Sequence, residues 1–198
     1  MEELSVSIHR LAASLPRYNH SFRAADIPVN GIYLMFEKGE AVSHPHYFGD
    51  RIVRVGTHKV DGRLPTRLRT HFRGNRRASI LRRHPANVMA AEQGYSALAA
   101  SAVSEEQIST RIADRFSFVC VRVPTQAERL AIESGLIALL ASYPLARPSA
   151  GWPGLLAHSV KIWESGLRNV LHVHGVPLSC AGLDRFRELV GITKEDKM

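Results

Sequence analysis

Glu133 is the acidic residue whose sequence surroundings most suggest chemistry. Leu130, Ile137 and Leu140 stand three, four and seven residues away, so a helix through this segment places all four on one face. A carboxylate on an apolar face costs several kcal/mol unless it meets a cation or a metal ion. The pattern indicates either a metal ligand or a glutamate paired with an arginine, and the spacing alone leaves both open.

Four further side chains could act on a phosphate group or a water molecule. Arg67 and His71 are one helical turn apart, which puts a permanent positive charge beside a side chain that titrates near neutral pH. Tyr33 lies in an apolar, strand-like run, and His58 comes soon after the glycine that ends the next run. Taken singly, each has an ordinary structural explanation, namely core packing, a surface charge, or a capped or strand-end position.

Positive charge is concentrated in one stretch of the chain. The net charge is +8, yet residues 51–84 hold eleven Lys or Arg and one Asp, while the remainder holds 15 basic and 17 acidic residues. Ten of the eleven are arginine, whose planar fork suits phosphate oxygens. A solvated basic helix face is the plainer explanation, but this density favours nucleic acid or another polyphosphate. The predicted nucleic-acid contacts are Arg54, Arg69, Arg73, Arg76, Arg77, Arg82 and Arg83.

Composition narrows the class of protein. The 198 residues suit one domain with a substantial core, and 45% hydrophobic with 22% charged residues is a globular balance. No apolar run approaches the roughly 20 residues of a membrane span, and the acidic start Met1-Glu2-Glu3-Leu4 lacks the layout of a signal peptide. Cys120 and Cys180 do not form a spaced pair, so we expect free thiols and a cytoplasmic protein.

The elements that must position these residues follow from periodicity and turn chemistry. Apolar runs predict strands, helical spacing predicts helices, and Ser104 with Gln107 predicts a capping box. The predicted strands are 31–37, 51–56 and 116–123, with a possible short one at 170–173. The predicted helices are 4–15, 65–72, a basic one capped by Asn75, 87–102, one after the capping box, 125–142, 155–163 and one near 183–190.

These elements predict an α+β fold, a small three-stranded antiparallel sheet flanked by helices. Residues 38–50 are expected to form a long loop between the first two strands. Simple alternation along the second strand puts Ile52, Arg54 and Gly56 on one face and Val53 with Val55 on the other. The predicted organisation is an N-terminal docking helix within 1–24, a core at 25–150, and a C-terminal extension at 151–198 packed on that core.

The order of strands, helices and motif residues resembles the GIY-YIG nuclease superfamily. Gly31-Ile32-Tyr33 matches its GIY element, and Arg54-Val55-Gly56 matches its YIG element with arginine in place of tyrosine. Arg67 and His71 match the arginine and histidine of the helix that follows, and Glu133 is the best placed match for the glutamate of a later helix.

The resemblance implies a division of labour for hydrolysis of a phosphodiester bond. Tyr33 would assist deprotonation of the attacking water, and Arg67 would steady the phosphate. Glu133 would hold one divalent ion, Mg²⁺ or Mn²⁺, while His58 or His71 could relay a proton.

Two positions depart from the family pattern. Arg54 cannot do what the YIG tyrosine does, and His58 is a candidate to take over part of that role. The family's asparagine has no clear match within 143–149, and Asn169 is a distant substitute.

Three functions follow from the sequence, in order of preference. The first is a metal-dependent endonuclease that acts on DNA, with RNA not excluded and the oligomeric state open. The second is a nucleic-acid-binding module on the same fold without cleavage, which the arginine at position 54 favours. The third is a scaffold whose arginines bind acidic protein or lipid surfaces.

Overall fold

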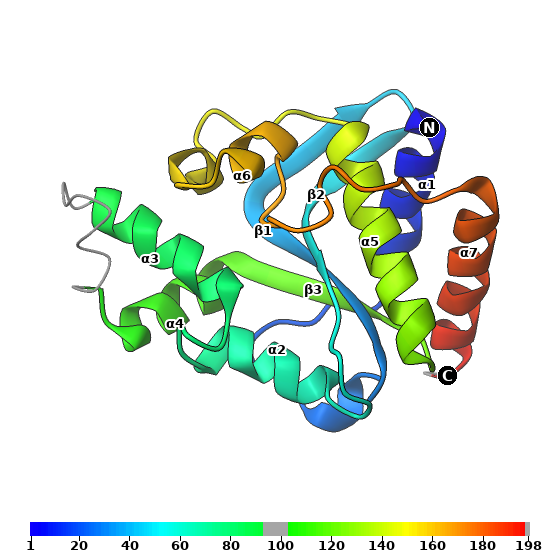
Figure 1. Ribbon diagram of the computed structural model, residues 1–198, viewed down its shortest axis with the longest axis horizontal. Helices are drawn as coiled ribbons and strands as arrows, with labels where there is room; N and C mark the ends of the chain where they lie inside the picture. The colour runs from blue at the N-terminus through cyan, green and yellow to red at the C-terminus, as the bar shows by residue number, and fades with distance from the viewer. Residues whose placement is uncertain (93–102, 197–198) are drawn as a thin grey trace.

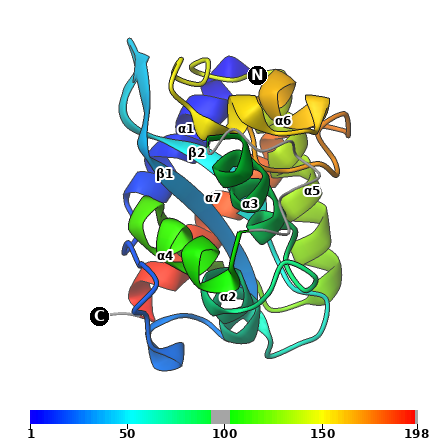
Figure 2. The same cartoon turned by 90° about the vertical axis from the view of Figure 1, so that its left-hand side faces the viewer.

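The protein is built from three layers, with a sheet between two layers of helices. A computed structural model describes residues 1–92 and 103–196. Figures 1 and 2 show α1, α5 and α7 covering one face of the sheet, and α2, α3 and α4 covering the other. The predicted α+β fold with a three-stranded antiparallel sheet is confirmed. Within the described residues, no helix is both long enough and apolar enough to span a membrane.

The sheet has the order β2-β1-β3, so the strand that carries the GIY tripeptide is central. β1 (Gly31–His44) pairs antiparallel with β2 (Tyr47–Gly56) and with β3 (Phe116–Arg122). The predicted loop at 38–50 was wrong. The two strands continue as a hairpin ribbon, with pairs from Ala41 with Asp50 to His44 with Tyr47. Its glycine, histidine and proline content is typical of a loop, but main-chain pairing between the neighbouring strands outweighs that local preference.

A bulge in β2 changes which side chains share a face. Met35 pairs with Arg54 and Phe36 with Ile52, so Val53 is the extra residue. The predicted alternation was therefore wrong, since Ile52 and Val55 share the core on the α5 side while Val53 joins the core on the α2 side. The bulge matters for the site because it sets Arg54 beside the central strand's tyrosine.

The helices form two hydrophobic cores around this sheet. On one side, α1, α5 and α7 bury residues such as Ile8, Leu136 and Phe186 against β1, β2 and β3. On the other, α2, α3 and α4 bury Leu68, Leu81 and Ile108 against the opposite face. The bounds on the first side are α1 Glu2–Ala13, α5 Gln126–Ser142 and α7 Cys180–Glu195. Those on the second are α2 Leu64–Arg73, α3 Ile80–Glu92 and α4 Glu105–Arg115.

Several predicted boundaries changed. Asn75 caps a turn, with the Ala78 N–H donating to its Oδ1 at 3.0 Å, and α3 begins later, at Ile80. Of the predicted helix 87–102, residues 93–102 lie outside the described residues. The capping box of Ser104 and Gln107 is confirmed at the start of α4.

The segment between α5 and α7 is less regular than its sequence indicated. The predicted helix 155–163 is instead a 3-10 turn (Pro153–Leu156) followed by α6 (Val160–Ser165), because Ala157 between them is extended. No strand forms at 170–173, and residues 171–175 run as bends and a turn. Another 3-10 turn, Ala24–Asp26, precedes β1.

Candidate active site

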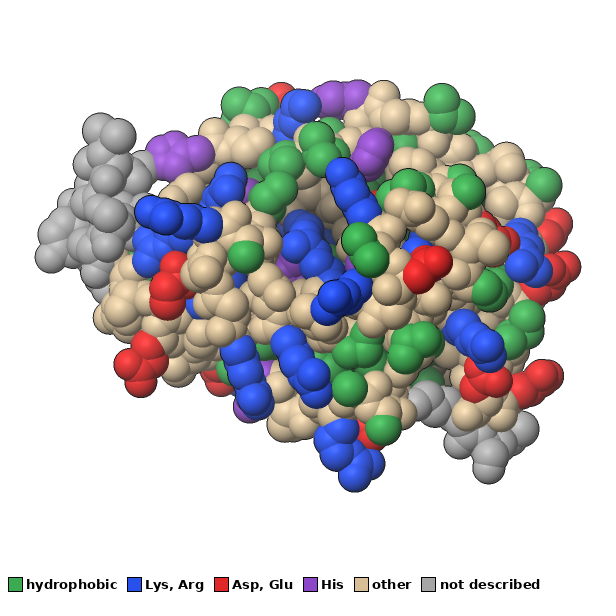
Figure 3. Space-filling model, turned by 60° about the horizontal axis from the view of Figure 1, so that its bottom comes forward, with side chains coloured by type: hydrophobic (Ala, Val, Ile, Leu, Met, Phe, Trp, Pro, Cys, Tyr) green, Lys and Arg blue, Asp and Glu red, His purple; other side chains and the backbone are tan. Residues whose placement is uncertain are grey.

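A cavity of about 750 Å³ lies where β2 ends, between α2 and α5. Figure 3 shows a hollow on this side of the molecule, with Lys and Arg side chains around and inside it and apolar side chains on its rim. Of the predicted site residues, Arg54, His58, Arg67 and Glu133 line the cavity. Residues separated by more than 70 positions along the chain therefore meet in one place.

Glu133 reaches the cavity from the middle of α5. Its Oε1 accepts a hydrogen bond from the Thr57 N–H at 3.0 Å, directly after the last residue of β2. No described residue donates a hydrogen bond to its other oxygen. Burial raises the pKa of Glu133, against the lowering effects of the Arg54 charge, the Thr57 N–H and the Arg67 charge. The sequence left open whether Glu133 binds a metal or pairs with an arginine. The structure is compatible with both, because the carboxylate has arginine charges nearby and one oxygen that accepts no hydrogen bond from the described residues.

The chemistry of this carboxylate fits one hard divalent cation. Mg²⁺ commonly binds through one or two carboxylates and keeps several waters and substrate phosphate oxygens. Among the described residues, no group of three or more His, Cys, Asp or Glu gathers to hold a metal by itself. Glu133 is therefore suited to Mg²⁺ or Mn²⁺ held jointly by one carboxylate, water and phosphate, and unsuited to a closed protein cage.

Two arginines face the carboxylate from different elements. Arg67 is on α2, which begins with Leu64-Pro65, a proline position that suits the first turn of a helix. It is half-buried, and its Nη1 donates to the Ala78 carbonyl at 3.2 Å. Arg54 is buried, and its Nη1 donates to the Arg168 carbonyl at 2.6 Å. Both guanidinium groups thus hold fixed positive charge at the cavity wall.

Tyr33 and His71 form a buried pair behind Arg54. The Tyr33 hydroxyl lies 2.6 Å from His71 Nε2, and both side chains are 0% exposed. Arg54 Nε lies 3.5 Å from the same hydroxyl, so the arginine separates the tyrosine from the cavity. A Cβ at Gly56 would lie 2.2 Å from this hydroxyl, so the YIG glycine is the residue that leaves room for the GIY tyrosine.

Ser79 completes the pair on its far side. Its Oγ lies 2.7 Å from His71 Nδ1, and it is buried. Burial, together with the Arg54, Arg67 and Arg82 charges, holds the pKa of His71 well below its usual range. The imidazole is therefore neutral, with one N–H, and it donates one of these two hydrogen bonds while accepting the other. Ser79 lies between a turn at 76–78 and the start of α3, and no motif spacing in the sequence marks it as a partner of His71.

His58 uses both ring nitrogens for the backbone. Nε2 accepts from the Gly31 N–H at 3.3 Å, and Nδ1 lies 2.7 Å from the Val60 carbonyl. Burial lowers the pKa of His58, which keeps the ring neutral with Nδ1 as the donor. The ring lines the cavity, but both of its nitrogens are engaged with backbone groups that join the end of β2 to the start of β1. This geometry fits a structural role at the strand ends better than proton relay.

Asn169, from a segment far along the chain, pairs with the exposed edge of β2. Its Oδ1 accepts from the Val55 N–H at 3.1 Å, and its Nδ2 donates to the Val55 carbonyl at 2.9 Å. The Arg168 N–H adds a bond to the Val53 carbonyl at 2.7 Å. This side chain lines the cavity. Sequence spacing named Asn169 only as a distant substitute for the family's asparagine, because its pairing with Val55 joins positions far apart along the chain.

The same segment carries a buried ion pair. Arg168 donates from Nε and Nη2 to the two oxygens of Glu37 at 2.8 and 2.9 Å. The Trp152 Nε1–H donates to Glu37 at 2.8 Å, and Arg115 adds a contact at 3.3 Å. Burial would raise the pKa of Glu37, but these cations and donors hold it below its usual value. The pair anchors the loop that carries Asn169 and the carbonyl that holds Arg54.

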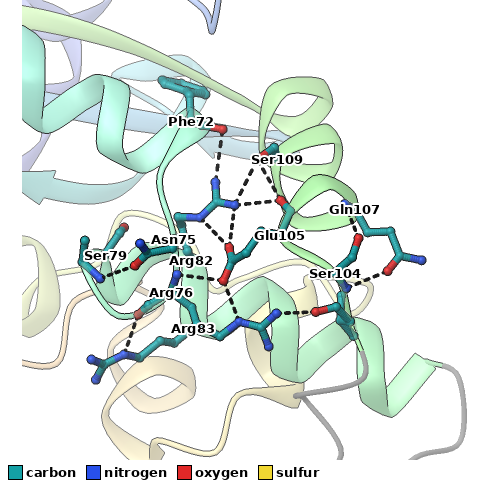
Figure 4. Close-up of polar contacts among 12 residues, drawn as sticks. Phe72, Asn75, Arg76, Ser79, Arg82, Arg83, Ser104, Glu105, Gln107 and Ser109 are labelled. Carbon is teal, nitrogen blue, oxygen red and sulfur yellow. Dashed lines mark hydrogen bonds and ion pairs between the residues drawn. The ribbon is translucent and has the colours of Figure 1, made fainter.

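The arginines predicted to contact nucleic acid on α2 and in the segment after it divide into two groups. Figure 4 shows Arg76 and Arg82 directed at Glu105 of α4, with contacts of 2.8 Å from each. Arg82 is 0% exposed and also donates to the His71 and Phe72 carbonyls at 3.1 Å, so it caps the end of α2. Its predicted contact with nucleic acid does not fit this burial, and Arg76 is already paired. The arginines with exposed side chains are Arg69, Arg73, Arg77 and Arg83.

Comparisons with known proteins bear on this site. The family model described as GIY-YIG domain matches residues 7–196, which includes every residue of the candidate site. Neither the curated proteins nor the solved structures contain a match to the chain. The match spans nearly the whole sequence and agrees with the central GIY strand, the YIG-like strand end and the helix bearing Arg67 and His71. The chain therefore belongs to the GIY-YIG domain family, and that membership points to nuclease activity on nucleic acid.

Proposed function

We propose that the protein is a metal-dependent endonuclease that hydrolyses DNA phosphodiester bonds in the cavity between α2 and α5. The observation that carries the proposal is that a half-buried carboxylate, Glu133, shares this cavity with Arg54 and Arg67. Hydrolysis of a phosphodiester needs an activated water and positive charge for the phosphate in the transition state. This combination supports the proposal better than any other cluster in the described residues.

Each residue has a part in the proposal. Glu133 would hold Mg²⁺ or Mn²⁺, which supplies Lewis acidity at the phosphate when bound. Arg67 supplies permanent positive charge for the phosphate. Tyr33 accepts a proton from the attacking water as it passes its own to His71 Nε2, and Ser79 fixes the imidazole for that transfer. Arg54 covers Tyr33 in the free protein, so phosphate binding must draw its guanidinium off the hydroxyl.

That last requirement favours a second function, a nucleic-acid-binding module without cleavage. Tyr33 is 0% exposed and lies behind Arg54, so no water reaches its hydroxyl in this arrangement. The binding module needs only the cationic cavity and the exposed arginines around α2. It predicts DNA binding that weakens with salt and needs no divalent ion.

Nicking of supercoiled plasmid DNA separates the two functions. We expect nicked product with Mg²⁺ or Mn²⁺ and none with EDTA. Arg67→Ala should slow nicking by about 10²–10³-fold, the usual effect of removing one transition-state donor. Arg69→Ala, assayed at saturating DNA, is the matched control, because Arg69 is an exposed arginine of the same helix that does not line the cavity and so should affect binding without slowing the bound complex. Salt-sensitive binding with no product at any metal concentration would select the binding module, and equal rates for the two variants would remove Arg67 from the mechanism.

A further inference from the structure

The cavity has two walls of opposite chemistry. The α2 side presents Arg63 and Arg67, with Thr66 and Thr70 between and beyond them. The opposite side, around Glu133, is aliphatic. Its apolar residues are Leu130 and Ile137 of α5, and Val170 and Leu171 of the segment that pairs with β2.

The aliphatic wall is open to solvent. Leu171 is 63% exposed and Leu130 is 38% exposed, and Val60 at the cavity rim is 65% exposed. Single exposed apolar residues are ordinary on a protein surface. Here several gather in one concave site, where burial against a ligand would release water from all of them.

The positively charged side chains of the cavity favour a ligand that carries negative charge. Arg54, Lys59, Arg63 and Arg67 line the cavity, and Glu133 is the one carboxylate among the described residues that line it. A ligand complementary to both walls has an anionic group and an uncharged apolar face within one small unit. A volume of about 750 Å³ is within the usual range for a site that encloses a small organic group, and is larger than a phosphate alone needs.

We infer that the cavity binds an unpaired nucleotide, with its phosphate between the α2 arginines and Glu133 and its base against the aliphatic side chains that flank Glu133. The inference rests on the proposed function, since it places the scissile phosphate in this cavity. A paired duplex presents its phosphates outward but keeps the faces of its bases stacked inside, so it cannot fill the aliphatic wall. The preferred substrate class is therefore DNA with an unpaired strand at the cleavage position, such as a fork or a flap.

The same chemistry occurs in a free nucleoside monophosphate, so the test must separate the two sources. Fluorescence anisotropy in EDTA measures binding without cleavage. The probes are a labelled fork and a fully paired duplex of equal nucleotide count, each competed with unlabelled single strand or with a nucleoside monophosphate. We expect the fork to bind about ten-fold more tightly than the duplex. The single strand should displace the fork, and the monophosphate should do so only weakly, because it lacks contacts to the exposed arginines.

Leu171→Ser tests the aliphatic wall directly. The side chain is largely exposed, so the substitution leaves the core intact. We expect it to lower fork affinity about five- to ten-fold, somewhat less than the loss of a fully buried leucine would give, and to change duplex affinity less than about two-fold. Val176→Ser is the matched control, because Val176 is 87% exposed on the same connection and does not line the cavity. Leu130→Ser repeats the test from α5.

Equal affinity for fork and duplex would overturn the inference, as would equal losses on both DNAs in the leucine variants. Displacement by the monophosphate as effective as that by the single strand would assign the cavity to a free nucleotide and overturn it too. The proposed function fails separately. Preserved fork preference without nicking at any metal concentration would reject cleavage and keep this substrate class.

Discussion

Replacing Glu37 by glutamine tests how the site is held together. Glu37 is 2% exposed on the central strand and accepts hydrogen bonds from Arg168, Trp152 and Arg115. Arg168 is 1% exposed and forms its ion pair with Glu37. Its Nη1 has no hydrogen-bond partner among the described residues, so little else offsets the buried charge. The glutamine keeps the shape but leaves this guanidinium buried and unneutralised.

The expected cost is large. Removing one partner of a buried ion pair typically costs about 3–5 kcal/mol. For a domain of this size, each kcal/mol lowers Tm by about 2–4 °C, so Glu37→Gln should lower Tm by roughly 6–20 °C. The effect should reach the cavity, because Arg168 supplies the carbonyl for Arg54 and is followed directly by Asn169. Nicking should therefore also fall at temperatures where the variant is still folded.

Calorimetry or urea unfolding measures this loss, with Glu106→Gln as the control. Glu106 is exposed on α4 and should leave Tm unchanged. Because the pKa of Glu37 is lowered in the folded state, its contribution is present above the unfolded pKa and disappears as pH falls. The Tm difference between wild type and Glu37→Gln should therefore shrink in acid. A Tm within about 2 °C of wild type at neutral pH would refute the anchoring role.

Three further predictions concern the buried pair and its neighbours. Gly56→Ala should lower the free energy of unfolding by about 1–3 kcal/mol, because its Cβ would lie 2.2 Å from the Tyr33 hydroxyl. In the same urea unfolding assay Gly151→Ala is the control and should be neutral, because a Cβ there would have nothing within 4 Å. Ser79→Ala should cost about 1–3 kcal/mol and shift the pH profile of nicking, because the α2 histidine loses the bond that fixes its protonated nitrogen; an unshifted profile would contradict this. Burial lowers the pKa of His9 to about 4 and of His84 to about 3, so below pH 6.5 the folded state binds fewer protons than the unfolded chain. The free energy of unfolding should therefore fall by about 1.4 kcal/mol per pH unit for each histidine as pH drops below 6.5. A urea midpoint that stays constant between pH 7 and 5 would exclude this.

Local patterns in the sequence predicted the parts of the fold that depend on near neighbours. The GIY strand, the helix with Arg67 and His71, and the Ser104 capping box all follow from spacing within a few residues. The convergence of Glu133 with Arg67 in one cavity agrees with the expected layout. Periodicity is reliable at this range because each side chain's direction is set by its own helix or strand.

Contacts between residues far apart along the chain could not be predicted from local sequence patterns. The β2 bulge depends on registry with the central strand, and the Asn169 bonds to Val55 join positions 114 residues apart. The charge run between residues 51 and 84 was treated as one binding surface, but Arg82 is neutralised by Glu105, which lies 23 positions later. Counting local charge cannot reveal such a partner, since folding brings it in from another helix.

Single-turnover nicking by Glu133→Gln, compared with Glu128→Gln, tests the central claim most directly. Both residues are on α5, but Glu128 lies outside the cavity and pairs with Arg185, so the two variants differ in position and share the same chemical change. With both variants folded and binding DNA, we predict that Glu133→Gln loses at least about 10²-fold in nicking rate at saturating Mg²⁺ while Glu128→Gln keeps the wild-type rate. Equal rates for Glu133→Gln and wild type across the Mg²⁺ titration would contradict the account.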